Sequence, residues 1–560
     1  MEAQALPPYR RDPSRVPAAW KRALDFWGMA IAIAPPQHKG GLNDPLAYID
    51  LKTRDVVVND LKVSAQDIGD CLEAIFAHEL GHHLHYPHSL ATQARLELLE
   101  HELLPIRGYS LLNLFSDFLI NCTLAKDATL QAQLTQIYRS MPAAAEDVKK
   151  DPAFFFYLLC FEEAWMCDPY ALTRDAGKQL EQDFTGARAE AQQLAEELPN
   201  LAPNLFTQFI YFASVVSRYQ PLESGNAQKS QELNPTAGDH SKPEAGDYAD
   251  ALERSPQEKD AIKRALGQGW LKPEQVPDAA ASQRKRASAL PGVLAGDPKK
   301  LAEAMAIHYR RLAERYLIQP PKNERAAEPI IPSTLSAWEV GDAPKEIDWR
   351  ASVSQGGVDI GLMQPLKRDF IEDDPTDAVR EFRTRLEIYL DVSGSMPDPK
   401  NALNPMTLAA QVLAMSCVRH EGQVRALIYS SNHVKHWVWT RSEMEISRFL
   451  MTYIGGGTDF PFAVLSASVK ETKASPPIRI VLTDSDFHAN MNTGTNRSFL
   501  KEAAQQGQFI TLLNGAQESA PWVKAIADAG ARTICVATME QFPKTAAALA
   551  RALFERKESA

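Results

Sequence analysis

The sequence has few cysteines and no long apolar run, and each shortage excludes a class of protein. The 6 cysteines among 560 residues lie far apart, and none forms a CxxC pair. In a chain of this length such cysteines are typical of reduced, buried thiols. The longest apolar runs, such as 154–161, fall far short of the roughly 18 residues that a membrane span needs. The N-terminus, MEAQALPPYRRDPSR, lacks the apolar core of a secretory signal, so we expect a cytoplasmic protein with no membrane contact.

An excess of basic residues is also missing. Lys and Arg number 60 against 71 Asp and Glu, which gives a formal net charge of −11 and a pI near 5.7. This balance argues against general nucleic-acid binding. The length allows two to four domains, and a hydrophobic content of 45% is enough for a sizeable core.

The pattern along the chain divides it into three regions. Residues 1–222 are mainly helical in pattern. Residues 223–320 are expected to be a flexible polar linker with short helices, because 223–248 is rich in Gly, Pro, Ser and Asn and has almost no apolar anchors. The third region is 321–560. Short apolar strands alternate with helices over about 385–560, which predicts a doubly wound, Rossmann-like parallel α/β sheet.

The first candidate site is an HExxH motif in the N-terminal region. Apolar residues recur at helical spacing from Ser64 to His85, and His78-Glu79-Leu80-Gly81-His82 lies on this predicted helix. Histidines four apart share one helix face, so both imidazoles can reach one Zn²⁺ ion. Glu79 lies alongside, where it can take a proton from a water at the metal. The alternative is two surface histidines beside an incidental glutamate.

A catalytic zinc needs a third protein ligand, and the sequence offers two. Asn113, Asp117 and Asn121 form a polar stripe on an otherwise apolar helix, and such a stripe needs partners that a metal site supplies. A solvated helix face is the other explanation. His88 follows His82 at the spacing of HExxHxxGxxH, but the glycine of that pattern is missing. We favour Asp117 over His88.

These motifs carry a family resemblance. HELGHH, followed by N-x-x-x-D-x-x-x-N on a later helix, resembles the metallopeptidase-like domain that precedes VWA-like domains in a group of bacterial proteins. The resemblance covers roughly residues 15–130. It implies a mainly α-helical, zincin-like domain with His78, His82 and Asp117 as zinc ligands and Glu79 as the catalytic general base.

The second candidate site lies in the C-terminal region. The strand LEIYL runs directly into Asp391, Ser393 and Ser395, and two later segments, GGGTD and IVLTD, contribute Thr458 and Asp484. Carboxylates and hydroxyls are hard oxygen ligands suited to Mg²⁺ or Mn²⁺. Each residue follows a predicted strand or a loop at the same sheet edge, where open α/β sheets bind ligands. A DVSGS turn beside unrelated loops is the alternative.

DxSxS, a Gly-flanked Thr and a strand ending in Asp together resemble the metal-ion-dependent adhesion site (MIDAS) of von Willebrand factor A (VWA) domains. The usual Gly after the last Asp is Ser485 here, which removes no ligand. The resemblance implies a recognition module that leaves one metal position for a partner's carboxylate.

The segment 337–350, AWEVGDAPKEIDWR, resembles the lead-in of VWA-like proteins encoded beside MoxR-type AAA+ ATPases. A surface segment packed by Trp338 and Trp349 is the alternative. GGGT is not followed by the Lys of a phosphate-binding loop, so no nucleotide site is expected.

Two functional hypotheses follow. The first is a zinc-dependent peptidase coupled to a Mg²⁺-dependent VWA module that binds a protein partner, expected to be a MoxR-type AAA+ ATPase. The second is a non-enzymatic adaptor for such an ATPase, with a structural or vestigial HExxH site. They differ at Glu79, which matters only if the protein is an enzyme.

Overall fold

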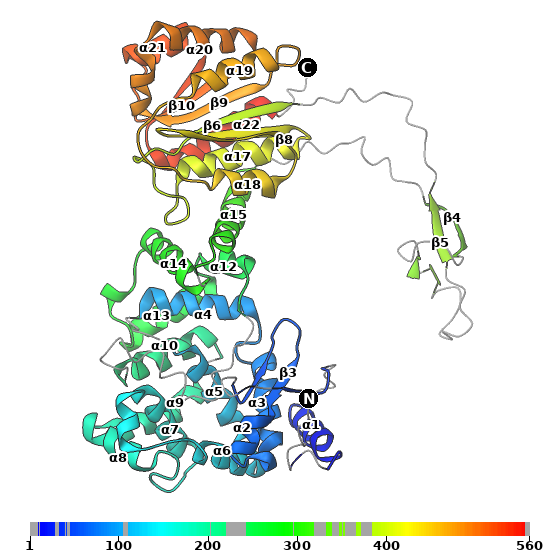
Figure 1. Ribbon diagram of the computed structural model, residues 1–560, viewed down its shortest axis with the longest axis vertical. Coiled ribbons are helices and arrows are strands. Elements are labelled where there is room, and N and C mark those ends of the chain that lie inside the picture. Colours follow the sequence, from blue (N-terminus) through cyan, green and yellow to red (C-terminus); the bar gives the residue numbers. More distant parts are fainter. Residues whose placement is uncertain are drawn as a thin grey trace, which may run out of the picture. The chain divides into compact units, whose positions relative to one another are not determined.

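A computed structural model describes most of the chain (Figure 1). It falls into two compact units. Unit 1 is Met1–Arg311 with the short stretches Met396–Asn404 and Met451–Tyr453, and unit 2 is the remainder of the chain. The described residues are 9, 12–28, 33–39, 41, 45–104, 110–201, 203–219, 242–294, 296–317, 332–338, 347–349, 351–352, 366–370 and 384–554.

Unit 1 is mostly helical, as its sequence pattern predicts. Short 3-10 turns, among them η2 (Gly69–Cys71), link some of its helices. The α-helices are α1 (Arg15–Phe26), α2 (Asp60–Ala65), α3 (Leu72–Leu84), α4 (Leu90–Leu103), α5 (Leu112–Leu124), α6 (Ala128–Arg139), α7 (Pro152–Ala164), α8 (Arg174–Asp183), α9 (Ala187–Glu197), α10 (Leu205–Val216), α12 (Ala245–Ala251), α13 (Pro256–Gln268), α14 (Ala279–Val293) and, crossing the boundary between the units, α15 (Pro298–Glu314).

A small sheet precedes the first candidate site. Its strands are β1 (Gln37–Lys39), β2 (Ala47–Ile49) and β3 (Val56–Asn59), in the order β1-β3-β2. β1 is parallel to β3, whereas β2 is antiparallel to it. The side chain of Asn59 accepts hydrogen bonds from Leu61 N and Lys62 N and so caps α2 directly after β3.

The core of unit 1 is built around helices that are apolar on every side. α7 has the sequence PAFFFYLLCFEEA, and Phe154 to Phe161 are all buried. Its start is fixed by Asp151, whose carboxylate caps the helix by accepting a hydrogen bond from Phe154 N, and by Pro152 in the first turn. A helix that is apolar all round must be surrounded by other elements, and α5 and α10 pack beside it.

The second half of the predicted linker differs from the expectation. Residues 220–241 lie outside the described residues, but α12, α13 and α14 belong to unit 1 and pack against α4 and α10. The polar sequence misled because its charges pair inside the protein. Arg286 is fully buried and binds the carboxylates of both Glu102 and Glu258. The boundary of the helical unit therefore lies well beyond residue 222.

Unit 2 contains a six-stranded sheet in the order β11-β10-β9-β6-β7-β8. Figure 1 shows α19–α21 on one face and α17, α18 and α22 on the other. The strands are β6 (Arg385–Asp391), β7 (Gln423–Tyr429), β8 (His433–Thr440), β9 (Ile478–Asp484), β10 (Phe509–Asn514) and β11 (Arg532–Val536). The helices are α17 (Pro405–Arg419), α18 (Glu443–Leu450), α19 (Phe462–Glu471), α20 (Gly494–Gln506), α21 (Pro521–Asp528) and α22 (Phe542–Phe554).

This sheet agrees with the predicted doubly wound fold except at one edge. The five strands from β11 to β7 are parallel, and β6, β7, β9 and β10 are buried along nearly their whole length, as strands covered on both faces must be. β8 is antiparallel to β7 and forms an edge. The sequence pattern did not predict it because the exposed polar side chains of His433 and Lys435 interrupt its apolar residues.

The segment that leads into this sheet is described only in part. β4 (Pro332–Ala337) and β5 (Leu366–Phe370) pair antiparallel. Most of the lead-in motif, 339–346, lies outside the described residues. Trp349 is 59% exposed, which does not support the packed surface segment considered as the alternative.

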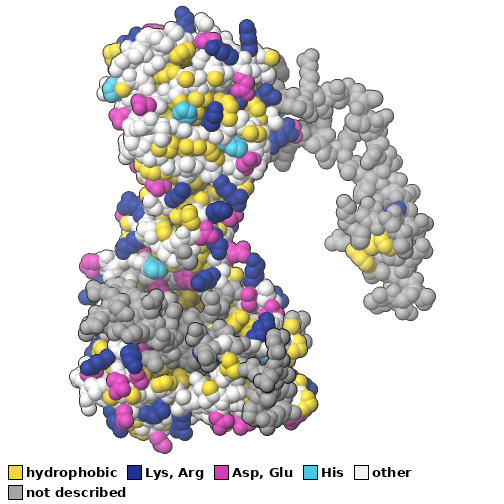
Figure 2. Space-filling model, in the orientation of Figure 1, with side chains coloured by type: hydrophobic (Ala, Val, Ile, Leu, Met, Phe, Trp, Pro, Cys, Tyr) yellow, Lys and Arg dark blue, Asp and Glu magenta, His cyan; other side chains and the backbone are white. Residues whose placement is uncertain are grey.

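Two surface properties bear on the expected class of protein. On the face shown in Figure 2, basic and acidic side chains are interspersed over the described surface. Within the described ranges, no helix is long and apolar enough to cross a membrane.

Candidate metal sites

The HExxH motif lies on α3, which begins later than its sequence pattern suggests. α2 ends at Ala65, and Asp67 adopts a left-handed conformation with a φ of 53°, so the chain turns before η2 (Gly69–Cys71) and α3. The helix runs from Leu72 to Leu84 and buries every residue from Ala74 to His82. The motif is therefore inside the unit, and the alternative of two surface histidines is wrong.

Gly81, in the middle of the motif, lets α5 approach α3 closely. A Cβ atom added at Gly81 would lie 2.7 Å from Ile120 Cγ2 and 3.2 Å from Trp27 Cζ2. Real Cβ atoms do not approach carbon so closely, so any larger residue here would push α5 away. Asp117 is on α5, one turn before Ile120, and this close packing brings its carboxylate to the two histidines.

The three predicted zinc ligands converge in unit 1. His78 Nε2 and His82 Nε2 are 3.2 Å apart, and they lie 3.4 Å and 3.2 Å from Asp117 Oδ1. Bond lengths of about 2.0–2.1 Å in a tetrahedral zinc site place neighbouring ligand atoms about 3.3 Å apart. All three side chains are buried, and they are the one cluster of this kind among the described residues. The spacing fits a single tetrahedral ion.

Hydrogen bonds to the Nδ1 atoms of His78 and His82 determine which ring nitrogen faces Asp117. His78 Nδ1 lies 2.8 Å from Asn121 Oδ1, and His82 Nδ1 lies 2.8 Å from the carbonyl oxygen of Tyr86. Asn121 donates its own Nδ2 to Tyr138 Oη, which leaves its oxygen to accept. Both Nδ1 atoms therefore carry hydrogen, and both Nε2 lone pairs point inward. Two lone pairs and a carboxylate oxygen in contact require a cation between them.

A proton shared between the histidines and Asp117 is one cation that can occupy this position. Burial by itself lowers the pKa of His78, but the contact with the Asp117 carboxylate raises it to about 9. Burial likewise opposes ionisation of Asp117, yet hydrogen bonds to His78 and His82 hold its pKa below the usual range. Metal binding would have to displace this proton, as for any histidine site.

Glu79 lies beside the three ligands without being one of them. Burial raises its pKa, while the nearby histidines and the backbone N–H of Ile49 on β2 lower it. Its Oε2 atom is buried and has no hydrogen-bond partner among the described residues. A buried, unsatisfied carboxylate oxygen is costly, and water or a ligand at this position would relieve the cost.

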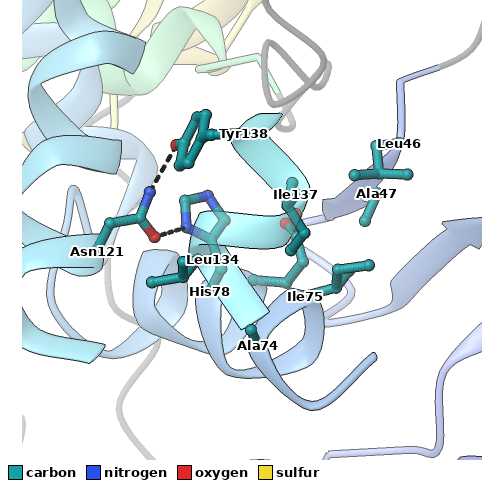
Figure 3. Close-up of a pocket in the computed structure, with 10 residues that line it drawn as sticks. Leu46, Ala47, Ala74, Ile75, His78, Asn121, Leu134, Ile137 and Tyr138 are labelled. Carbon is teal, nitrogen blue, oxygen red and sulfur yellow. Dashed lines mark hydrogen bonds between the residues drawn. The ribbon is translucent and has the colours of Figure 1, made fainter. Parts of the chain in front are cut away.

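A cavity of about 350 Å³, counting its open mouth, adjoins the site (Figure 3). His78, Glu79 and Asn121 form its polar side, while the remaining wall is mostly aliphatic. That wall is contributed by β2 and the residue before it, α3 and α6, with lining residues Leu46, Ala47, Ala74, Ile75, Leu134, Ile137 and Tyr138.

The other candidates lie elsewhere. His88 has a φ of 59°, its ring nitrogen contacts the Pro87 carbonyl, and it is not part of the ligand cluster. Asn121 was noticed only as part of a polar stripe, whereas here it holds His78; the stripe itself was the signal that could have found it.

Four of the five predicted MIDAS residues, Asp391, Ser393, Ser395 and Asp484, lie together at the carboxyl edge of the sheet in unit 2. Ser393 Oγ lies 3.1 Å from Ser395 Oγ, which donates to Asp484 Oδ2 at 2.7 Å. Octahedral Mg²⁺ with bonds of about 2.0–2.1 Å holds neighbouring oxygens about 2.9 Å apart. Burial and the Asp484 carboxylate raise the pKa of Asp391, while Thr483 donates to Asp391 Oδ2 at 2.6 Å. These oxygens fit a divalent cation.

Thr458 is brought to the same edge by backbone contacts. Gly455 N donates to Val392 O at 3.0 Å, and Gly394 N donates to Gly456 O at 2.8 Å. Gly456 has a φ of 96°, and a Cβ there would also meet Ser431 Oγ at 2.7 Å, so glycine is required. The loop therefore lies against the DVSGS turn.

Comparison with known proteins adds only a partial similarity of fold. No family model and no curated protein matches the sequence. A von Willebrand factor type A protein from Catenulispora acidiphila is 12% identical in sequence. The match covers 30% of this chain and 42% of that protein, with a TM-score of 0.23. BatB from Bacteroides thetaiotaomicron is 16% identical over 31% of this chain and all of its own, also with a TM-score of 0.23.

A third structure spans more of the chain. The Deinococcus radiodurans Ro (RSR) protein is 14% identical over 84% of this chain and 93% of its own, with a TM-score of 0.23. The chain thus spans less than half of the first structure and nearly all of the other two. The VWA-like similarity extends over about 30% of the chain, and similarity this weak carries no further argument.

Proposed function

We propose that unit 1 is a zinc-dependent peptidase and that unit 2 is a Mg²⁺-dependent VWA-type module that binds a protein partner. The observation that supports the first half is the convergence of three inward-facing ligand atoms at tetrahedral spacing beside a buried glutamate. The order of the two sites along the chain, and the resemblance of the lead-in motif, support a MoxR-type AAA+ ATPase as the partner.

The chain's own residues would have distinct roles in hydrolysis. A zinc ion held by His78, His82 and Asp117 would supply Lewis-acid activation of a water molecule and of the peptide carbonyl. Glu79 would accept the proton of the attacking water, and its raised pKa suits a base that must also return a proton. Asn121 would keep His78 in the tautomer that presents Nε2.

A non-enzymatic adaptor is the second candidate, and burial of the site favours it. Glu79 is 3% exposed and His82 1% exposed, and the backbone of β2 occupies one side of Glu79. The cavity beside the site is lined mostly by aliphatic side chains, and little of Glu79 is exposed in it. A structural zinc needs no access for a peptide.

Paired variants separate the two. Purified protein should contain about one zinc per chain. Glu79→Gln should retain that zinc and lose all hydrolysis of a casein or mixed-peptide substrate if the protein is a peptidase. Wild-type protein that binds zinc but cleaves no peptide, and behaves like Glu79→Gln in every assay, would support the adaptor.

The third ligand is tested in the same preparation. Asp117→Ala should lower zinc affinity sharply, whereas His88→Ala should leave it unchanged. The reverse result would place His88 in the metal site and would refute the proposed ligand set. Unchanged zinc content in the His78→Ala/His82→Ala double variant would refute the site as a whole.

A further inference from the structure

We propose that Asn490 is a positioning residue for the magnesium site of unit 2, because it joins the segment that carries Thr458 to the segment that carries Asp484. The inference rests on the proposed metal-binding function of that site. Asn490 belongs to no MIDAS pattern in the sequence; only the folded structure brings it beside the two segments.

The Asn490 amide holds the backbone on both sides of Asp459. Its Nδ2 donates to Thr458 O at 2.7 Å, and its Oδ1 accepts from Phe460 N at 2.9 Å. Because one side chain makes both bonds, the position and direction of the Thr458 segment are fixed relative to Asn490. An amide suits this role because it offers a donor and an acceptor in one plane.

Asn490 is itself fixed to the Asp484 segment. It lies on η8 (Ser485–Met491), the 3-10 stretch that follows Asp484 directly. The Asp484 carboxylate caps this stretch by accepting from Asp486 N at 2.9 Å. Phe487 and Met491 are buried in the core, and Asn496 Nδ2 donates to Asn490 O at 2.8 Å. The bridge therefore has a rigid support.

Contacts on the opposite side complete the clamp. Asp459 N donates to Ser430 O at 2.9 Å, and Gly457 N donates to Ser431 Oγ at 2.7 Å. The Thr458 segment is thus held from the end of β7 on one side and from Asn490 on the other. Without Asn490, the hydrogen bonds to Ser430 and Ser431 would remain, but the Thr458 segment would lose its connection to the Asp484 segment.

This connection matters because Mg²⁺ demands nearly ideal octahedral geometry. A small shift of Thr458 relative to Asp484 would leave the ion with poorly placed ligands. Groups that orient metal ligands typically contribute roughly 10–100-fold to metal affinity. We therefore expect a loss of that order when the bridge is removed.

The experiment measures Mn²⁺ affinity of the full-length protein by electron paramagnetic resonance, with the His78/His82 site preloaded with zinc. The Asp391→Ala protein defines the signal that does not come from this site. Asn490→Ala removes both hydrogen bonds. Asn490→Asp keeps an acceptor for Phe460 N but replaces the donor to Thr458 O with a carboxylate oxygen, so it tests the Thr458 bond separately.

A matched control accounts for lost stability. Ser442 Oγ accepts a hydrogen bond from Glu445 N at 3.2 Å at the start of α18. Ser442→Ala should lower stability by about 1 kcal/mol, as loss of a helix cap does. The second readout is the rise in melting temperature on adding Mg²⁺, which a purely structural residue would not change.

We expect both Asn490 variants to bind Mn²⁺ at least about tenfold more weakly and to lose the Mg²⁺-induced rise in melting temperature, while Ser442→Ala keeps both. Wild-type Mn²⁺ affinity in Asn490→Ala, or in Asn490→Asp if the alanine variant does not fold, would overturn the inference. Equal binding by wild type and Asp391→Ala would instead refute the metal site itself.

Discussion

At the scale of single residues, Gly81 decides whether Asp117 can reach His78 and His82. Its missing Cβ admits Ile120, and with it the helix that carries Asp117. Gly81→Ala should therefore separate α5 from α3 and lower zinc affinity by roughly tenfold or more. Zinc competition with a chromogenic chelator measures this directly.

Gly267 provides the control for that substitution. It lies within α13, and a Cβ added there meets nothing within 4 Å. Gly267→Ala should leave zinc affinity unchanged and should stabilise the protein slightly, by about 0.5–1 kcal/mol. Equal zinc affinities of Gly81→Ala and wild type would show that the contact with Ile120 does not set the position of Asp117.

At the scale of elements, Glu100 connects the end of α4 to the start of α5. Its carboxylate accepts hydrogen bonds from Leu111 N at 2.7 Å and from Ser110 Oγ at 2.6 Å. Burial raises the pKa of Glu100 from its ordinary value of 4.5 to about 7, despite these two bonds. The nearby Glu97 carboxylate adds to the rise.

The direction of this shift predicts the pH dependence. The folded protein holds the Glu100 proton more tightly than the unfolded chain does. The resulting stabilisation is complete below pH 4.5 and is lost as the pH rises through about 7. It amounts to about 3 kcal/mol. Glu100→Gln should therefore gain stability relative to wild type between about pH 5 and about pH 8, measured by urea unfolding. A pH-independent difference would contradict the prediction.

The contacts that hold α12, α13 and α14 to unit 1 are also tested at this scale. Arg286 is fully buried and is bound by Glu102 and Glu258. Arg286→Met should cost about 3 kcal/mol or more, because each carboxylate loses a buried partner. Arg218→Met, at a half-exposed pair with Glu190, should cost less than about 1 kcal/mol. Similar costs for the two variants, measured by urea unfolding, would mean that the Arg286 network contributes little.

At the scale of the whole molecule, the two sites belong to separate compact units, so their losses should be independent. Asp391→Ala should abolish Mg²⁺-dependent binding of the proposed ATPase partner while one zinc per chain remains. His78→Ala should lose the zinc and keep the Mg²⁺-dependent binding of the partner. Loss of both properties from either change would show that the units fold as one. Full partner binding by Asp391→Ala would place the interface elsewhere.

The sequence by itself determined what local periodicity can encode. Two histidines four apart on a helix share a face, and Asp391, Ser393 and Ser395 at alternate positions share a strand end. The alternation of apolar strands and helices likewise predicted the sheet of unit 2. In each case the residues are close in sequence, and the geometry of one element fixes their relative positions.

The tertiary structure decided what depends on packing between distant segments. Asp117 rather than His88 joins the histidines because α5 packs on Gly81. Helices α12–α14 belong to unit 1 because their charges find buried partners, which composition alone presented as a solvated linker. Asn490 bridges two loops that no sequence pattern connects. Such contacts depend on the complementary shape and charge of side chains far apart in the chain, and no local rule specifies them.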